Sequence, residues 1–455
     1  MKNLKDLSEK ELLFKGAGEN LLPHYAMVSE IREKGPKILS RGEGALLWDI
    51  DGKEYIDGHS ILWVANIGHG RKEIAEAASA QMEKFAYGSL FGGYYNEPAI
   101  KLAMKLAEIT PGDLNAIFLV SGGSEAVEAA IKIARQYHQR KGYPNRYKII
   151  SRRESYHGVT YGALSATGLR IYRTPFEPLV PGFVHVPAPY CYHCDYGKEY
   201  PDCEIECADA IEDTILWEGP KSVAAVIGEP VMSAAGVLAP PKEYWEKVRA
   251  VCNKYEILLI ADEVINAFGR TGKFFACEHY GITPDIMTFA KAMSGGYAPI
   301  GAAAVSKKIA DEFVDWMFVH GITYGGHPVS ATCAMKNIEI LEREKLPGRA
   351  EEMGRYLKEG LNSLKSHRIV GDVRSIGLHS AIEYVKDKKT REPLSGKERV
   401  ASKIEEISWQ RGLYLCRASV DKTYVAPPLV IEKKQIEKVI GILDEAIGIV
   451  EKDIK

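Results

Sequence analysis

The sequence of 455 residues has no long apolar run, no excess of one charge and few cysteines. No stretch approaches the roughly 18 apolar residues of a membrane-spanning helix. Residues 1–6 lack the apolar core of a signal peptide, so we expect a cytoplasmic protein. The 59 basic and 61 acidic side chains give a net charge of -2 and form no basic stripe. This balance argues against nucleic acid or an anionic membrane as a partner.

Short apolar runs separated by helical patterns fill the middle of the chain. They predict a mostly parallel sheet with helices on both faces. The runs are at 116–120, 147–151, 223–228, 257–261, 286–290 and 300–305. Residues 37–57 alternate around Asp51-Gly52 and predict antiparallel strands outside that sheet. We expect long helices from Ser330 and Lys434, a large domain at 70–330, and a small domain built from 1–69 and 331–455.

Two of these runs end in a charged residue, Asp262 and Lys291. Ligands bind at the carboxyl edge of an open α/β sheet, so both charges are expected at one buried site. A partly desolvated lysine can form a Schiff base, and a buried carboxylate keeps a heteroaromatic nitrogen protonated. The pair suits pyridoxal phosphate. The alternative is a buried ion pair, or two strand ends that face solvent.

A phosphate cradle is predicted where the run at 116–120 enters the turn Ser121-Gly122-Gly123-Ser124 and a helical pattern. Glycines let backbone amides approach an anion, and a helix amino terminus attracts negative charge. The turn matches neither G-x-G-x-x-G nor G-x-x-x-x-G-K-[ST], so a dinucleotide or nucleoside triphosphate is poorly supported. The alternative is that Ser124 only caps the helix.

Two further residues are expected to enclose a planar ring. Tyr156 follows the run at 147–151, and an aromatic side chain at a strand end can stack on a cofactor. Val264 lies two residues past Asp262, so strand alternation would direct it to the same side and to the opposite face of the ring.

Several motifs occur together in one order: SGGSEA at 121–126, YHG at 156–158, DEVI at 262–265, GRTG at 269–272, Lys291 with Gly295-Gly296, and TYGGHP at 323–328. They resemble the class III (ω-amino acid) aminotransferases, which are pyridoxal-phosphate enzymes of fold type I. The resemblance runs from about Gly35 to the carboxyl end. It implies an α/β large domain with a mostly parallel sheet and a smaller α+β domain from both termini.

The resemblance also implies roles at matching positions. Lys291 corresponds to the lysine that binds the cofactor covalently, and Asp262 to the partner of the pyridine nitrogen. The phosphate cradle corresponds to Gly123 and Ser124, and the two ring faces to Tyr156 and Val264. Thr323 would reach the phosphate of a second subunit, which implies a homodimer.

The substrate class rests on a departure from this pattern. Ornithine and 4-aminobutyrate aminotransferases carry a glutamate shortly after the Glu-Pro pair, whereas this chain has Ala234 there. Arg417 instead resembles the mobile arginine of amine:pyruvate and β-alanine:pyruvate aminotransferases, where it would clamp the carboxylate of the acceptor. We therefore expect an ω-amino acid or primary amine as donor and an α-keto acid as acceptor, with pyruvate favoured and 2-oxoglutarate possible. Trp63 resembles a pocket residue of the same subgroup, although a tryptophan among aliphatic residues also suits a core.

Four of the eight cysteines cluster as Cys191, Cys194, Cys203 and Cys207. Their spacing suits a structural zinc site, one or two disulfides, or free thiols, and the sequence leaves all three open.

Two rival functions remain at this stage. The same scaffold supports racemases, aminomutases and decarboxylases, and a non-enzymatic interaction protein is a further alternative. Intact Lys291, Asp262 and Tyr156 argue against the second.

Overall fold

The computed structural model describes residues 7–416 and 419–454. Its centre is a seven-stranded sheet whose strands are parallel except for β10. In spatial order the strands are β4 (Ala116–Val120), β10 (Gly301–Val305), β9 (Ile286–Phe289), β8 (Leu258–Asp262), β7 (Val223–Gly228), β5 (Lys148–Arg152) and β6 (Phe183–Val186). The expected mostly parallel sheet is confirmed. Strand β6 was not predicted from the sequence.

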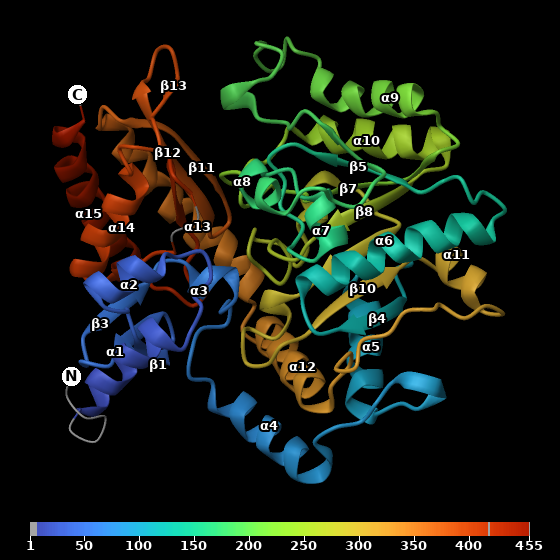
Figure 1. Ribbon diagram of the computed structural model, residues 1–455, viewed down its shortest axis with the longest axis horizontal. Coiled ribbons are helices and arrows are strands. Elements are labelled where there is room, and N and C mark those ends of the chain that lie inside the picture. The colour runs from blue at the N-terminus through green and yellow to red at the C-terminus, as the bar shows by residue number, and fades with distance from the viewer. Residues whose placement is uncertain (1–6, 417–418, 455) are drawn as a thin grey trace.

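Helices cover both faces of this sheet, because successive strand residues point to opposite sides. Ile260 of β8 packs in one core with α6 (Gly123–Arg140), whereas the preceding Leu259 packs in another core with Trp245 of α10 (Lys242–Tyr255). Figure 1 shows α6 and α7 (Tyr161–Ala166) in front of the sheet. Further helices of this part are α4 (Lys72–Phe85), α5 (Glu97–Ile109), α8 (Arg170–Arg173), α9 (Glu206–Glu218), α11 (Lys307–Ala310) and α12 (Pro328–Arg343).

Segments from both ends of the chain form the part on the left of Figure 1. The expected hairpin is present as β2 (Leu46–Asp49) and β3 (Glu54–Asp57), with β1 (Leu39–Glu43) beside β2. Strand β14 (Leu413–Tyr414), from far along the chain, pairs in parallel with β3. A second sheet contains β11 (Val370–Ile376), β12 (His379–Asp387), β13 (Glu392–Pro393) and β15 (Lys422–Val425). The domain boundaries stay predictions.

The remaining helices pack around these two small sheets. They are α1 (Glu9–Glu19), α2 (Val28–Lys34), α3 (Ser60–Trp63), α13 (Leu346–Ser363), α14 (Val400–Gln410) and α15 (Lys433–Val450). The long helices α12 and α15 begin within two residues of the predicted starts. Within residues 7–416 and 419–454, no helix is both long and apolar enough to cross a membrane.

A buried histidine should make the fold sensitive to acid. His138 of α6 is 2% exposed and its Nε2 donates to the carbonyl oxygen of Ala224, 2.9 Å away in β7. Burial lowers the pKa of His138 to about 4. Between about pH 6.5 and 4 this histidine binds a proton in the unfolded chain but not in the native state. The free energy of unfolding therefore decreases as the pH falls through this window.

We predict that His138→Gln reduces this acid sensitivity. Measured by urea denaturation, the free energy of unfolding should fall between pH 7 and pH 5 by roughly 1–2 kcal/mol more in the wild type than in the variant. The exposed His24 provides a control, since His24→Gln should leave the pH dependence unchanged. Identical pH dependence in the wild type and His138→Gln would contradict the prediction.

Candidate active site

A cavity of about 340 Å³ opens at the carboxyl edge of the parallel strands. Its size is that of a small-ligand pocket. It is lined by Val64, Ser121, Gly122, Gly123, Ser124, Tyr156, His157, Gly158, Glu229, Asp262, Val264, Ile265, Ala290, Lys291, Ser294, Gly296, Ala298, Pro299 and Ile300. Segments from five strand ends therefore meet here, as the sequence predicted for Asp262 and Lys291.

Asp262, the last residue of β8, is 3% exposed and accepts three hydrogen bonds. Its Oδ2 lies 2.7 Å from His157 Nδ1, and its Oδ1 lies 3.1 Å from both Thr288 Oγ1 and Val264 N. Because a carboxylate only accepts, the His157 proton must be on Nδ1. His157 Nε2 is buried and has no partner among the described residues. The carboxylate is thus held in one orientation at the cavity wall.

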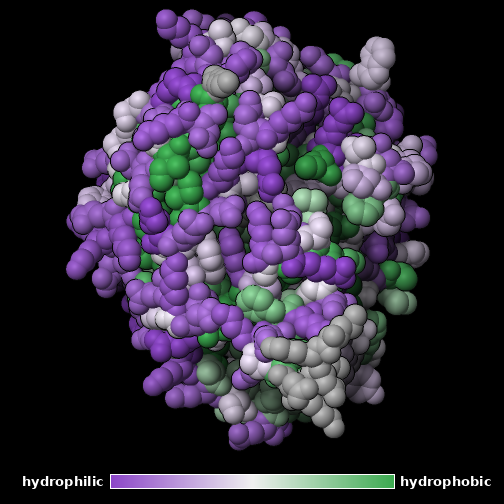
Figure 2. Space-filling model, turned by 60° about the vertical axis from the view of Figure 1, so that its left-hand side comes forward, coloured by the Kyte–Doolittle hydropathy of each residue, from purple (hydrophilic) through white to green (hydrophobic). Residues whose placement is uncertain are grey.

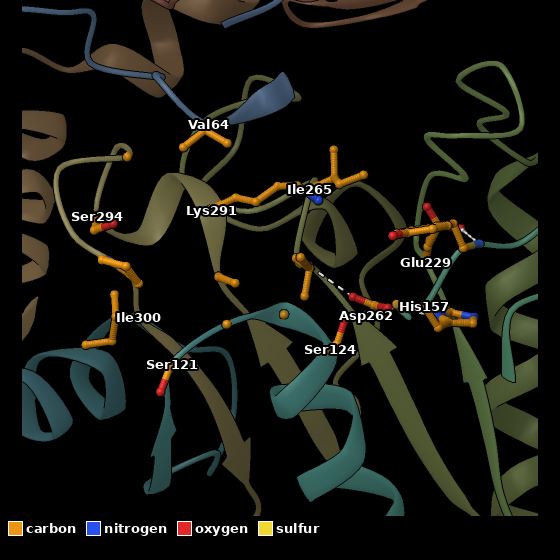
Figure 3. Close-up of a pocket in the computed structure, with 18 of the residues that line it drawn as sticks. Val64, Ser121, Ser124, His157, Glu229, Asp262, Ile265, Lys291, Ser294 and Ile300 are labelled. Carbon is orange, nitrogen blue, oxygen red and sulfur yellow. Dashed lines mark hydrogen bonds and ion pairs between the residues drawn. The ribbon is translucent and has the colours of Figure 1, made fainter. Parts of the chain in front are cut away.

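Lys291 enters the cavity through an unusual backbone turn. It begins the short 3-10 helix Lys291–Met293, directly after β9 and Ala290, and has a φ of +47°. A positive φ is uncommon for a long side chain. In Figure 3 the side chain extends between Val64, above, and the turn with Ser121 and Ser124, below.

The Lys291 amine is poised to lose its proton. Burial lowers the pKa of Lys291, and the negative charges of Asp262 and Glu229 oppose that shift in part. Within residues 7–416 and 419–454, Lys291 makes no ion pair, and Asp262 is held by His157 instead. The alternative of a buried Asp262–Lys291 ion pair is therefore wrong.

The turn before α6 presents bare backbone to the cavity. Gly122 is the N-cap and Gly123 the first helical residue, so the first N–H groups of α6 have no acceptor within the helix. A Cβ on Gly123 would lie 2.8 Å from Val264 Cγ1, whereas a Cβ on Gly122 would meet nothing within 4 Å. This combination fits an anion seated against the helix end.

Ser124 does not cap this helix. Its Oγ instead accepts a hydrogen bond from Val159 N at 3.1 Å, which ties the first turn of α6 to the Tyr156 loop. The alternative reading of Ser124 as a helix cap is thus incorrect, and the hydroxyl lines the cavity.

Tyr156 and Val264 both line the cavity, as expected. Val264, however, does not reach the cavity from a strand. Strand β8 ends at Asp262, and Val264 lies in the turn beyond it, where its N–H donates to Asp262 Oδ1. Strand alternation was therefore the wrong argument. The Tyr156 ring lies 5.5 Å from the Tyr172 ring in an edge-to-face contact.

Glu229 is a cavity residue that the sequence analysis missed. It is 2% exposed and follows β7 directly, and its two oxygens accept from Tyr156 N at 3.1 Å and Ser233 N at 2.9 Å. Burial raises the pKa of Glu229. The signal was available, because Glu229 ends an apolar run as Asp262 does.

The segment around Trp63 forms the roof of the cavity through another side chain. Trp63 is 4% exposed and its Nε1 donates to His379 Nδ1 at 3.2 Å, while Val64 lines the cavity. All four residues of α3, Ser60 to Trp63, have positive φ, at 46°, 44°, 78° and 59°. Asp57 Oδ1 accepts from the backbone N–H groups of His59 at 3.0 Å and Ile61 at 3.2 Å, which supports this left-handed turn.

Two further predicted residues lie away from the cavity or outside the described residues. Thr323 is exposed and does not line the cavity of its own chain. Its carbonyl accepts from Tyr87 Oη at 2.9 Å. Arg417 lies outside the described residues.

The cysteine segment contacts the small sheet that contains β11 and β12. Cys191, Cys194, Cys203 and Cys207 are free thiols. Among the described residues no three His, Cys, Asp or Glu side chains are placed to hold a metal ion. Burial and then the neighbouring thiols raise the pKa of Cys207 to about 12. Nearby, His193 Nε2 lies 3.0 Å from Glu383 Oε1 in β12, so this segment joins the two parts of the molecule.

Known proteins match the chain over almost its whole length. A family model described as aminotransferase class-III matches residues 28–447. The putrescine–pyruvate aminotransferase of Pseudomonas aeruginosa is 38% identical over 428 residues, 92% of each chain. An (S)-enantioselective ω-transaminase from Thermomicrobium roseum superposes with a TM-score of 0.94 at 43% identity, covering 98% of this chain and 99% of that one. The ω-transaminase of Pseudomonas jessenii, solved in complex with PMP, gives 0.93 at 35% identity, covering 97% and 99%.

Proposed function

The chain belongs to the class III aminotransferases, and from this premise we propose that it carries an amino group from a primary amine or ω-amino acid to pyruvate. It is a pyridoxal-phosphate-dependent transaminase. The relatives described above are all transaminases, which leaves the racemase, aminomutase and decarboxylase alternative without support. The preference for pyruvate rests on one relative's described acceptor and on the sequence near Arg417.

One observation carries the assignment of the site. A lysine with a lowered pKa, a fixed carboxylate and a bare helix end face a single cavity. These groups fit the amine-reactive aldehyde, the ring nitrogen and the phosphate of the cofactor. When bound, pyridoxal phosphate supplies an electron sink for the bonds at the substrate's Cα.

The chain's own residues would bind and orient that group. The first N–H groups of α6, with Gly123 and Ser124, hold the phosphate. The Asp262 carboxylate, fixed by His157, keeps a proton on the ring nitrogen, because a nearby anion raises that nitrogen's pKa. Tyr156 and Val264 hold the two faces of the ring.

Lys291 would carry out the proton transfer. Burial increases the neutral fraction of its amine, and a neutral amine is the nucleophile needed for the covalent link to the aldehyde. A free Nζ would act as the general base that takes the proton from the substrate's Cα and as the general acid that returns a proton. Asp262 and Glu229 partly offset the lowered pKa, so the amine can carry a proton in both directions.

Replacing Lys291 with Ala should remove both the anchor and the proton carrier. We expect turnover to fall by about 10³-fold or more, equivalent to about 4 kcal/mol of barrier, and the borohydride-reducible visible absorbance to disappear. Lys307→Ala, at an exposed position following β10, is the control and should retain turnover. Near-normal turnover in Lys291→Ala would refute the assignment.

We also propose how the chain binds the carboxylate of the acceptor. Ala234 offers no carboxylate to an arginine, and its carbonyl oxygen accepts from Tyr424 Oη at 2.6 Å. A switch based on a glutamate at this position is therefore unavailable. We propose that Arg417 binds the carboxylate of the keto acid and leaves the pocket for a donor without one.

Arg417→Ala should weaken the acceptor half-reaction selectively. A charge-assisted bidentate contact contributes roughly 1.5–3 kcal/mol, so the KM for pyruvate should rise by about 10-fold to 150-fold. The half-reaction with an amine that lacks a carboxylate should change by less than about threefold, because no contact is lost. Stopped-flow measurement of each half-reaction tests this, and equal losses in both would mean that Arg417 acts structurally.

We further propose a homodimer in which Thr323 serves the neighbouring site. Tyr87 and Phe91 contact the 321–324 segment, and further exposed apolar side chains lie close to these residues in the sequence. They include Met82, Phe85, Tyr94, Tyr95, Val314, Trp316, Met317, Val319 and Tyr324. The face seen in Figure 2 is instead mostly hydrophilic. Such a number of exposed apolar side chains favours a protein partner, and a second copy would also bring Thr323 to a cavity.

Heterodimers purified through two tags would test the shared site. If Thr323 acts on the neighbouring chain, Lys291→Ala paired with Thr323→Ala restores one complete site. When a chain with both substitutions is paired with a wild-type chain, the one site that keeps Lys291 lacks Thr323. We expect the first pairing to be roughly tenfold more active, the loss typical of one phosphate hydrogen bond. If the second pairing were the more active, Thr323 would belong to the site of its own chain.

A cytoplasmic location stays a prediction.

A further inference from the structure

Glu229 holds a carboxylate in the buried wall of the cavity. It is 2% exposed, and its Oε1 and Oε2 accept from Tyr156 N at 3.1 Å and from Ser233 N at 2.9 Å. In the described part of the chain these are the only hydrogen bonds of the two oxygens, and the carboxylate accepts in both. A neutral side chain would be less costly to bury, so the presence of a charge here needs a reason.

The carboxylate joins the loops that follow two neighbouring strands. Strand β5 pairs in parallel with β7, so their carboxyl ends lie at the same edge of the sheet. Tyr156 lies in the loop after β5, whereas Glu229 and Ser233 follow β7. Arg152, the last residue of β5, donates from Nη2 to the carbonyl oxygen of Glu229 at 2.5 Å. Glu229 is therefore held on one side and fixes the backbone of Tyr156 on the other.

The negative charge of Glu229 also faces the other ionisable groups of the site. Figure 3 shows Glu229 and His157 on the same side of the cavity, past Asp262. Among the described residues, the titratable groups that face the Lys291 amine are Asp262, Glu229 and the buried His59. Burial raises the pKa of Glu229, and Asp262 adds to the rise, whereas His157 and the two N–H donors oppose it. These donors stabilise the ionised carboxylate.

We propose that Glu229 is a positioning residue for the cofactor ring, which fixes the backbone of Tyr156 and supplies a second negative charge beside Lys291. The proposal rests on the transaminase site proposed above, in which Tyr156 covers one face of the ring. The bond to Tyr156 N reduces the freedom that this residue loses when the ring binds, and such pre-organisation strengthens binding. The charge stabilises a proton on the Lys291 nitrogen beyond what Asp262 alone provides.

Two variants of Glu229 separate its reach from its charge. Glu229→Gln removes the charge and replaces one acceptor oxygen with an amide group that can only donate, so one of the two backbone bonds is lost. Glu229→Asp keeps the charge but shortens the side chain by one carbon. The first variant therefore removes both functions, and the second removes only the clamp on Tyr156.

Glu263 provides a matched control. It is also a buried carboxylate, 0% exposed, and its oxygens accept from Cys277 N at 2.7 Å and from Ala276 N at 3.0 Å. Its side chain does not line the cavity. Glu263→Gln thus removes an equivalent charge and disturbs an equivalent pair of backbone bonds at a loop that does not carry Tyr156.

We expect Glu229→Gln to weaken the affinity for pyridoxal phosphate about tenfold, a loss typical of one hydrogen bond. The visible circular dichroism of the bound cofactor, which reports the orientation of the ring, should change. The pH midpoint of the holoenzyme's visible absorbance should move to lower pH, because the protonated Lys291 nitrogen loses a stabilising negative charge. Glu229→Asp should lose affinity and keep the wild-type midpoint. Glu263→Gln should keep the affinity, the dichroism and the midpoint, whatever its effect on urea denaturation.

Each part of the proposal can fail separately. Wild-type affinity and dichroism in Glu229→Gln would overturn the clamp, and an unchanged pH midpoint would overturn the role of the charge. Equal changes in Glu229→Gln and Glu263→Gln would show that Glu229 only supports the fold. If Glu229→Gln does not fold, Glu229→Asp decides: wild-type affinity would contradict the clamp, and a displaced midpoint would contradict the role of the charge. Failure of the proposed function is distinct, because it appears as near-normal turnover in Lys291→Ala.

Discussion

A buried guanidinium, that of Arg270, joins the pieces of the chain that roof the cavity. Arg270 is 0% exposed. Its Nη1 donates to the carbonyls of Leu378 and Pro427, at 2.9 and 2.6 Å, and its Nη2 to Ser60 Oγ and Asn66 Oδ1, at 2.8 and 2.5 Å. Burial lowers its pKa to about 9. Its hydrogen-bond acceptors are all neutral oxygens, and the negative charge of Asp57 opposes the lowered pKa. Removing any one acceptor leaves a costly unmet donor. The large sheet, the amino-terminal segment and the carboxyl-terminal segment are thereby held in one arrangement.

That arrangement explains why the cavity combines rigid and adjustable walls. The floor consists of strand ends and the first turn of α6, and Asp262 is fixed there by three hydrogen bonds. The roof is Val64, from the segment before β4, and that segment is held in place by long-range contacts such as the bond of Arg270 to Ser60. The cofactor chemistry is proposed for the residues of this floor.

The sequence predicted the floor much better than the roof. Asp262, Lys291 and the Gly122-Gly123 turn follow from apolar runs and from the rule that parallel strands share one ligand-binding edge. The positive φ of Lys291, the turn that carries Val264, and the His157–Asp262 bond depend on tertiary packing and leave no periodic signal. Likewise Val64 rather than Trp63 lines the cavity, because the handedness of α3 cannot be read from local propensity. Strand β6 is short and only partly apolar, and was missed.

The left-handed turn at Ser60–Trp63 has a consequence for how this protein can change. Each non-glycine residue in that conformation costs roughly 1–2 kcal/mol, a penalty that glycine avoids. Glycine at these positions would form the same turn with less strain. The present residues are therefore favoured only by the interactions of their side chains. Ser60 bonds Arg270, and Trp63 bonds His379, but Leu62 is 44% exposed and makes no comparable bond among the described residues. At position 62, glycine would therefore relieve backbone strain without removing a side-chain bond or a residue that lines the cavity.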